Sequence, residues 1–329
     1  MTKRTPVLSV LAATALLLTA CGTERAGGGG AVGADPDATA PSSATPVDGP
    51  GKDGVRVTSV TLPQPSAPAS PGRAVVTDRL SRDSGVSAAY EVTNSGSETL
   101  TYTAVVTFMS ANGGAVTSQT VTVRDVGPGK TVRGTVRAGE VPPGAPRIRR
   151  AKVLTATKVP AGEAPAEAGA CPASGVRVSA DQGDAAMGLR VVGLHLENCG
   201  TRDYVVEGYP QLDLRDADFE PVGGIRILRG SEEITTGAGP DERPRRVVLR
   251  PGEAASAALV WRNTTEAGTA VTVPYVRVRA KAGAEPVTFT PNLDLGTTGR
   301  LGVRPWKEAD PRERAQGPGQ PQGQGAPAR

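Results

Sequence analysis

The chain has 329 residues, of which 42 are Gly and 29 are Pro, with 3% aromatic residues and a formal net charge of +4. The length allows about two domains, and no amphipathic helical pattern is sustained beyond the N-terminal segment, which excludes a mainly helical protein. Because aromatic residues are rare, any core must consist mainly of Val, Leu, Ile and Ala. This composition is typical of strands connected by tight turns, with disordered linkers between folded parts.

The N-terminal segment has the pattern of an export signal. Two cations precede an apolar run at 7–18, and small residues follow it. The run is shorter than the roughly 20 residues that a transmembrane helix needs. Its ending, Leu18-Thr19-Ala20-Cys21, resembles the lipobox of bacterial lipoproteins, in which the cysteine thiol receives diacylglycerol and becomes the mature N-terminus. The alternative is an ordinary cleaved signal followed by a chance cysteine.

We therefore expect residues 1–20 to be a lipoprotein signal peptide and Cys21 to carry fatty acyl chains such as palmitate. The protein would then be exported and held by its lipid anchor at the outer face of the cell membrane. Residues 21–52 are expected to be a disordered tether, because they are rich in Gly, Pro, Ser and Ala without apolar periodicity. A phosphate-binding loop at Gly27–Gly30 is rejected, since no strand precedes it and no Lys-Ser/Thr follows it.

Alternation of apolar and polar residues predicts a first β-sandwich module at 53–158. Asn112-Gly113 is the strongest hairpin signal in it, because both turn positions of such a hairpin require a positive φ. No helical pattern interrupts the strands, so we expect an antiparallel sandwich. The expected strands are 55–62, 86–94, 101–108, 116–123, 131–138 and 150–157.

A second linker is expected at 159–170, followed by a second β-sandwich module at 171–306 and a disordered tail at 307–329. The expected strands of the second module are 176–180, 189–198, 211–216, 245–253, 255–261 and 275–280. The two modules echo each other, because 92–102 and 196–206 both contain a strand, an Asn, a Gly turn and another strand. Either one sandwich is duplicated or both modules use the commonest turns.

Several motifs of the second module resemble a domain-of-unknown-function family, numbered four-two-three-two, that is common in lipoproteins of high-GC Gram-positive bacteria. These motifs are Asn198-Cys199-Gly200, Gly208-Tyr209-Pro210, Arg250-Pro251-Gly252, Leu259-Val260-Trp261-Arg262 and the segment 293–301. The resemblance covers about 171–306 and implies an Ig-like sandwich at the cell envelope, but it supplies no ligand or catalytic residue. Many members have a cysteine at the position of Tyr204, whereas this chain has Cys199.

Cys171 and Cys199 remain after processing, and an even pair in an exported protein indicates a structural disulfide. Free thiols, or a redox or metal role, are the alternatives. An antiparallel pairing of the first two strands of the second module would bring the two cysteines together. We expect no metal site and no cofactor, because the chain has one histidine.

Two further groups of residues have some features of a functional site. His195 lies in a strand between two leucines and would have to support any histidine catalysis alone, so we interpret it as a half-exposed strand residue. Asp216, Asp218 and Glu220 alternate as calcium ligands do, but the turn glycine of a calcium loop is missing. A solvated turn is the better interpretation of this acidic run.

The positive charge is concentrated in the first module. Residues 53–160 hold 13 Lys and Arg against 7 Asp and Glu, whereas 171–306 hold 16 against 17. We select Arg147, Arg149, Arg150 and Lys152 as a candidate contact for an anionic surface, either lipid headgroups or a phosphate-bearing wall polymer. A solvated basic face is the plain alternative, and nucleic acid is not expected as a partner.

Together these patterns predict an all-β protein of two Ig-like antiparallel sandwich modules without enzymatic activity. Its expected role is binding or scaffolding at the envelope, with a further envelope protein as an unidentified partner. The alternatives are a hydrolase that acts on cell-wall material and a small-solute-binding lipoprotein.

Overall fold

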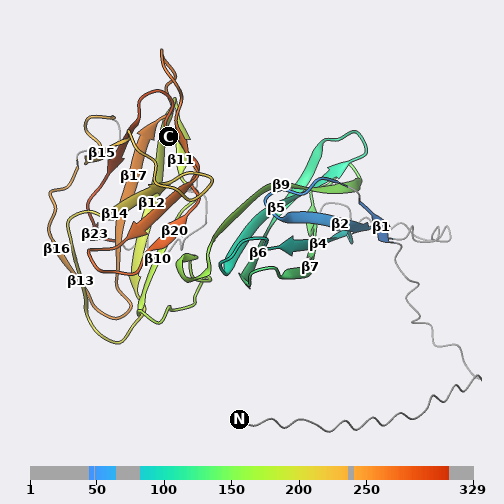
Figure 1. Cartoon of the computed structure of the whole chain (residues 1–329), viewed down its shortest axis with the longest axis horizontal. Helices are drawn as coiled ribbons and strands as arrows, with labels where there is room; N and C mark the ends of the chain where they lie inside the picture. The colour runs from blue at the N-terminus through green and yellow to red at the C-terminus, as the bar shows by residue number, and fades with distance from the viewer. Residues whose placement is uncertain (1–43, 48, 64–81, 236–240, 311–329) are drawn as a thin grey trace, which may run out of the picture. The chain divides into compact units, whose positions relative to one another are not determined.

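The computed structural model describes residues 44–47, 49–63, 82–235 and 241–310 (Figure 1). Almost all regular structure in these ranges is β-strand, and the 3-10 turn η1 (Ala161–Glu163) is the one helical element there. No helix among the described residues is long and apolar enough to cross a membrane. The predicted all-β class is confirmed, while the signal peptide, Cys21 and residues 311–329 lie outside the described part of the chain.

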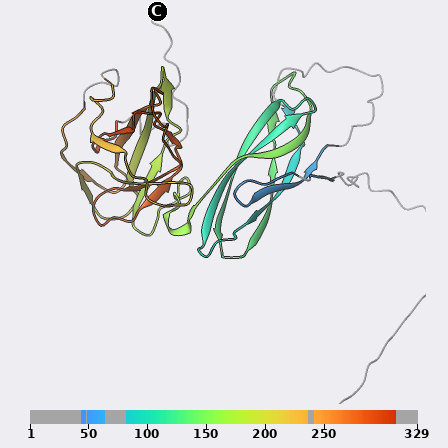
Figure 2. The same ribbon diagram turned by 45° about the horizontal axis from the view of Figure 1, so that its top comes forward.

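The first module consists of two antiparallel sheets, seen from two directions in Figure 1 and Figure 2. One sheet has the order β1-β2-β4-β7 and the other has the order β6-β5-β9, with a short β3–β8 ladder beside them. The core lies between the sheets, where Val57, Val92, Val106 and Phe108 are buried. The strands are β1 (Ala44–Pro46), β2 (Val55–Thr61), β3 (Arg82–Asp83), β4 (Ser87–Thr93), β5 (Leu100–Ser110), β6 (Ala115–Val126), β7 (Thr131–Arg137), β8 (Glu140–Val141) and β9 (Ile148–Pro160).

The first module is longer than the predicted range 53–158. Strand β1 lies inside the segment predicted as tether and pairs with β2. At the other end, β9 continues to Pro160. Strand β1 has no apolar periodicity because it is an exposed edge strand that main-chain hydrogen bonds hold. Its last residue, Pro46, fits such an edge, where the missing N–H removes no ladder bond.

The second module places a large sheet, in the order β10-β12-β17-β22-β15, against smaller sheets formed by β13-β16 and β14-β19-β20. The core between them includes both tryptophans, Trp261 and Trp306. The strands are β10 (Val176–Ala180), β11 (Asp184–Ala186), β12 (Leu189–Asn198), β13 (Tyr204–Glu207), β14 (Gln211–Arg215), β15 (Arg226–Arg229), β16 (Arg246–Leu249), β17 (Ala254–Arg262), β18 (Thr272–Val273), β19 (Tyr275–Arg279), β20 (Val287–Phe289), β21 (Leu293–Asp294), β22 (Arg300–Val303) and β23 (Lys307–Glu308).

Two features of the second module differ from the prediction. Strand β15 pairs with β22 in parallel, so the large sheet is mixed rather than purely antiparallel. Strand β23 pairs with β17, and the Ala309 N–H donates to the Ala254 carbonyl, so the module extends beyond residue 306. Main-chain hydrogen bonds hold this short strand against β17. Because its residues, Lys307–Glu308, are polar, no apolar pattern in the sequence predicts it.

The two modules share one strand order. The pairing β2-β4-β7 corresponds to β10-β12-β17, and β5 pairs with both β6 and β9 in the first module. In the second module the counterpart of β5 is divided into β13, which pairs with β16, and β14, which pairs with β19. Gly208-Tyr209-Pro210 interrupts the strand, because Pro210 has no N–H to donate. At this break, the backbone N–H of Trp306 donates to the Gly208 carbonyl.

Candidate functional site

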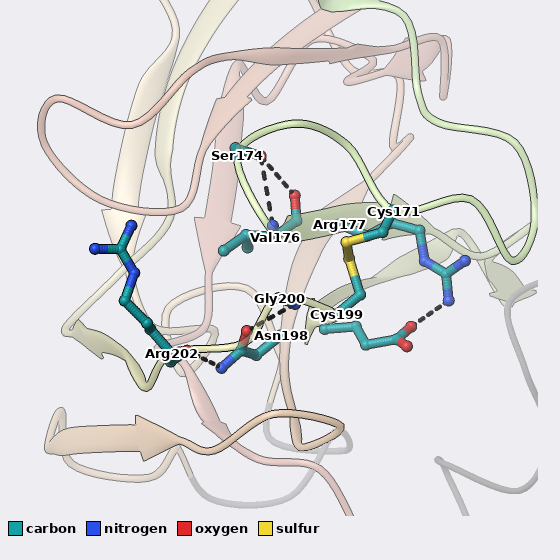
Figure 3. The surroundings of a disulfide bond; sticks show 9 residues. Cys171, Ser174, Val176, Arg177, Asn198, Cys199, Gly200 and Arg202 are labelled. Carbon is teal, nitrogen blue, oxygen red and sulfur yellow. Dashed lines mark hydrogen bonds and ion pairs between the residues drawn. A yellow bond between two sulfur atoms is a disulfide. The ribbon is translucent and has the colours of Figure 1, made fainter.

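Cys171 and Cys199 form a disulfide with a Cα–Cα distance of 5.7 Å (Figure 3). Cys171 precedes β10 and Cys199 follows β12, and the pairing of Val176 with Asn198 brings the two ends together. The separation lies within the roughly 4.4–6.8 Å that disulfides require. The predicted pairing is therefore confirmed.

The disulfide lies where two turns approach very closely. A Cβ at Gly175 would lie 3.2 Å from the Gly200 Cα, and Gly175 has a φ of +73°. Both features exclude most side chains from this position. The flanking residues Arg177 and Glu197 are directly opposite each other on β10 and β12 and form an ion pair. This end of the second module is thus tied covalently, by backbone contact and by charge.

The four basic residues of the candidate anionic contact are Arg147, Arg149, Arg150 and Lys152, and all four are exposed. Arg147 immediately precedes β9 and the other three belong to it. Within the described residues none of the four has a carboxylate at ion-pair distance. Elsewhere in the first module, by contrast, Arg56 and Arg133 both bind Glu91, at 2.6 and 2.7 Å. These two guanidinium groups hold the pKa of the Glu91 carboxyl below its usual value.

Strand β9 exposes consecutive residues because it contains two irregularities. Met109 pairs with Arg150 and Ser110 with Ile148, so Arg149 is an extra residue. Likewise, Val105 pairs with Thr155 and Val106 with Val153, which leaves Leu154 without a partner on β5. A bulge redirects the side chain of the extra residue. As a result, Arg149 and Arg150 are both exposed, and 45% of Leu154 is exposed.

A groove of about 400 Å³ lies beside this part of β9. The segment 49–52 and Val47 form one wall, and residues 151–154 form the other. The Lys52 ammonium donates to the Leu154 carbonyl at 2.7 Å, which fixes the entering chain against β9. The candidate contact of the first module is therefore a basic strand with an exposed leucine and a largely apolar groove beside it.

The residues behind the family resemblance have structural roles in the second module. Asp294 accepts hydrogen bonds from the Trp261 indole at 2.8 Å and from the Asn263 amide at 3.1 Å. Arg190 lies 3.5 Å from the same carboxylate. The Trp306 indole donates to the Ala280 carbonyl at 2.9 Å. The carboxylate of Asp294 thus joins β12, β17 and β21 and accepts the hydrogen bond of the buried Trp261 indole N–H.

His195 faces Asp181 rather than a nucleophile. The His195 Nε2 atom lies 3.8 Å from Asp181 Oδ2, and Asp181 Oδ1 accepts the N–H groups of Gly183 and Gly193 at 2.8 and 2.9 Å. Burial raises the pKa of Asp181, but the nearby His195 side chain and the hydrogen bonds from the Gly193 and Gly183 N–H groups outweigh it, and the pKa is lowered overall. The arrangement fixes the loop between β10 and β11.

The acidic run forms a turn. The Asp216 carboxylate accepts the N–H groups of Asp218 and Glu220 at 2.9 and 2.8 Å. One potential calcium ligand is therefore used to close the turn itself. Among the described residues no group of three or more His, Cys, Asp or Glu side chains is placed to hold a metal ion.

The sequence did not indicate a carboxylate-binding site on the outer face of β19 and β20. Arg277 donates to Glu163, which belongs to η1, at 2.7 Å from its Nε, and a second guanidinium nitrogen also contacts this carboxylate. The Thr288 hydroxyl donates to it at 2.8 Å. Glu163 raises the pKa of Arg277. The sequence signal was one of two Glu residues in the predicted linker, and its Arg partner lies 114 residues away.

A second polar cluster, also not foreseen, joins residues 231 and 232, which follow β15, to Asp241 and Arg304. Asp241 accepts the Ser231 hydroxyl at 2.9 Å and the Glu232 N–H at 3.2 Å. The Arg304 Nε lies 3.1 Å from the same carboxylate and 3.1 Å from the Ser231 hydroxyl oxygen. These contacts join members of the cluster to one another, and we interpret the cluster as structural.

A pocket of about 380 Å³ lies between the segment 162–166 and the second module. Tyr204, Val176, Lys281 and Val287 contribute to its lining. The Lys281 ammonium lies 4.1 Å from the centre of the Tyr204 ring and donates to the Val205 carbonyl at 2.8 Å. The volume is within the range of sites for small molecules.

These features define a β-sandwich protein whose second module carries a disulfide and whose first carries a basic strand. Residues 171–307 match the family model described as Domain of unknown function (DUF4232). The match covers the second module and confirms the resemblance of that region. No curated protein and no solved structure matches the chain.

Proposed function

We propose that this is an exported, lipid-anchored envelope protein whose two Ig-like modules have a non-enzymatic binding or scaffolding role. The Cys171–Cys199 disulfide is the observation that carries the proposal, because structural disulfides form and persist in oxidising compartments outside the cytoplasm. The N-terminal segment, with its export pattern and its Leu-Thr-Ala-Cys ending, supports the same location.

The anchor is proposed to be Cys21 with two or three acyl chains. Each buried CH₂ group contributes about 0.8 kcal/mol to membrane binding, so one chain gives marginal binding and two give durable binding. The family to which the second module is similar is common in lipoproteins of high-GC Gram-positive bacteria, which supports a lipoprotein of this type. Its partner would be a further envelope protein, with anionic lipid or wall polymer as additional contacts.

Replacement of Cys21 tests the anchor. We expect the Cys21→Ala variant, expressed with its own signal segment, to leave the membrane fraction, while the unchanged protein stays there through a high-salt wash. A variant that stays membrane-bound after the wash would show that Cys21 is not the anchor. Chemical cross-linking in the envelope, followed by identification of the linked proteins, then tests the scaffolding role.

The pocket beside Lys281 favours a second candidate function, the capture of a small solute. The ammonium on its wall is suited to an anionic solute, so small carboxylates such as citrate are the first probes. Titration calorimetry of the lipid-free chain, with Lys281→Gln as the comparison, tests this candidate. If neither protein gives a binding isotherm with any small carboxylate, this function is rejected.

A further inference from the structure

The point where the chain enters the first module is the starting observation. Strand β1 is the first described strand, and Ala44 pairs with Thr61 at the end of β2. In the same sheet, Thr61 pairs with Ser87, and Ser87 pairs with Arg137. The chain therefore enters at the end of the module where β2 and β7 finish and β4 starts, on the right of the module in Figure 1.

The cations of the candidate anionic contact lie at that same end. Strand β9 starts there, because Ile148 pairs with Ser110, the last residue of β5 before the hairpin. Its other end, at Pro160, pairs with Leu100 and leads to the second module. Arg147, Arg149 and Arg150 thus lie near the entry point, and the exposed Arg137 belongs to the same end. Among the described residues, Asp83 and Glu140 of the β3–β8 ladder are the acidic ones at this end, and they are outnumbered by the basic residues there.

The entering chain also contacts the basic strand directly. Val47 and residues 49–52 line the groove beside β9, and Lys52 binds the Leu154 carbonyl. If Cys21 carries the anchor, 22 residues separate it from Ala44. If these residues form the tether that the sequence predicts, their root-mean-square span is roughly 25 Å. The tether would therefore keep this end of the module within reach of the bilayer surface.

We infer that this end of the first module is a membrane contact that binds anionic phospholipid headgroups, an inference that rests on the proposed anchoring at Cys21. Arg147, Arg149, Arg150 and Lys152 supply the charge. The exposed Leu154 lies about halfway along β9, on the same strand as the cations, and it favours a lipid surface over a wall polymer, since a leucine can insert among headgroups but has no partner on a polyphosphate chain. The contact orients the module on the membrane and leaves the linker end directed away from it.

Vesicle binding by the lipid-free chain, residues 22–329, tests the inference without the anchor. We expect binding to vesicles that contain about one third phosphatidylglycerol, no binding to phosphatidylcholine vesicles, and a steep loss of binding with added salt. The variant R147Q/R149Q/R150Q/K152Q should bind the anionic vesicles roughly 100-fold or more weakly, because each cation near the surface contributes separately. Leu154→Ser should weaken binding without changing its salt dependence.

A matched control removes four exposed arginines from the second module, R202Q/R243Q/R246Q/R250Q, and should bind as the unchanged chain does. Equal binding to neutral and anionic vesicles, or an equal loss in both variants, would overturn the inference. Binding to purified phosphate-bearing wall polymer but not to anionic vesicles would also overturn it and would assign the cations to the polymer. Because no acyl chain is present, these outcomes are independent of the Cys21→Ala experiment.

Discussion

Asn94 and Asn198 occupy equivalent positions in the two modules and make the same hydrogen bonds. The Asn94 amide donates to the carbonyls of Glu98 and Val126, both at 2.7 Å, and its side-chain oxygen accepts the Gly96 N–H at 2.9 Å. The Asn198 amide donates to the carbonyls of Arg202 and Leu249, both at 2.8 Å, and its oxygen accepts the Gly200 N–H at 3.2 Å.

The backbone bonds of the two asparagines also correspond. Asn94 donates its N–H to Lys130 and accepts from Gly129, at 2.9 and 2.8 Å, while Asn198 donates to Glu253 and accepts from Gly252, at 2.9 and 2.7 Å. Each asparagine therefore ties the end of one strand to the turn before another. Together with the shared strand order, this indicates that the two modules have one fold type.

We predict that Asn94→Ala and Asn198→Ala each destabilise their own module by about 2–4 kcal/mol. Both side chains are fully buried, and each truncation removes the hydrogen bonds that the side chain makes with two carbonyls and one N–H. Since both tryptophans belong to the second module, the unfolding transition seen by tryptophan fluorescence should respond to Asn198→Ala and not to Asn94→Ala. Calorimetry of the whole chain also records the unfolding of the first module, and it should therefore show the effect of Asn94→Ala.

Asn112 in the β5–β6 hairpin provides the control for these variants. Its side chain is exposed, so Asn112→Ala should change stability by no more than about 0.5 kcal/mol. An effect of Asn94→Ala as small as that of the control would show that the buried hydrogen bonds contribute little.

The disulfide is predicted to stabilise the second module by roughly 3–4 kcal/mol. It joins two residues 28 positions apart and so lowers the conformational entropy of the unfolded chain. Reduction, or the C171S/C199S double variant, should lower the melting temperature seen by tryptophan fluorescence and leave the calorimetric transition of the first module unchanged. The oxidised protein should also be about 2 Da lighter than the dithiol. Free thiols at both positions in protein isolated from the envelope would contradict this prediction.

We predict that Glu163→Gln loosens the segment that follows β9. The substitution removes the charge that Arg277 and Thr288 bind, and hydrogen bonds to charged groups contribute about 1.5–3 kcal/mol. Limited proteolysis within 161–170 should become faster. Glu167→Gln is the matched control, because the Glu167 side chain is 71% exposed and its pair with Arg124 should contribute at most about 1 kcal/mol. Equal cleavage rates in the two variants would contradict the prediction that Glu163, rather than Glu167, holds this segment in place.

The alternating strands and the disulfide could be predicted because each depends on a local pattern. Strands β10 and β12 were predicted with their observed bounds, since each alternates and ends at a turn. The Asn-x-Gly echo was visible as well, although its meaning depends on carbonyls 32 and 51 residues away. Such partners follow from tertiary structure and leave no local signal.

The basic contact could be predicted only in part. The sequence showed the cations but not the bulges at Arg149 and Leu154, because a bulge is a property of the pairing between two strands. The edge strands β1 and β23 were missed for a related reason, since main-chain bonds hold them and their side chains carry no apolar pattern. The parallel pair β15–β22 joins segments too far apart in the chain for the local pattern to give their direction.

The last prediction concerns the acid stability of the second module. The pKa of Asp181 is lower in the folded chain than in the unfolded one, because burial, which alone would raise it, is outweighed by the nearby His195 side chain and by the hydrogen bonds from the Gly193 and Gly183 N–H groups. A carboxyl with a lowered folded pKa stabilises the fold fully above its unfolded value of about 3.9, and this stabilisation is lost as the pH falls through the folded pKa. We therefore expect the urea midpoint of the unchanged protein, followed by tryptophan fluorescence, to fall as the pH drops below about 4. Asp181→Asn should lower the midpoint at neutral pH and flatten this acid decline, since an amide does not titrate. The exposed Asp184, three residues further on, provides the control, and Asp184→Asn should keep the acid profile of the unchanged protein. If Asp181→Asn keeps the full acid decline, other carboxyl groups determine the acid stability of this module.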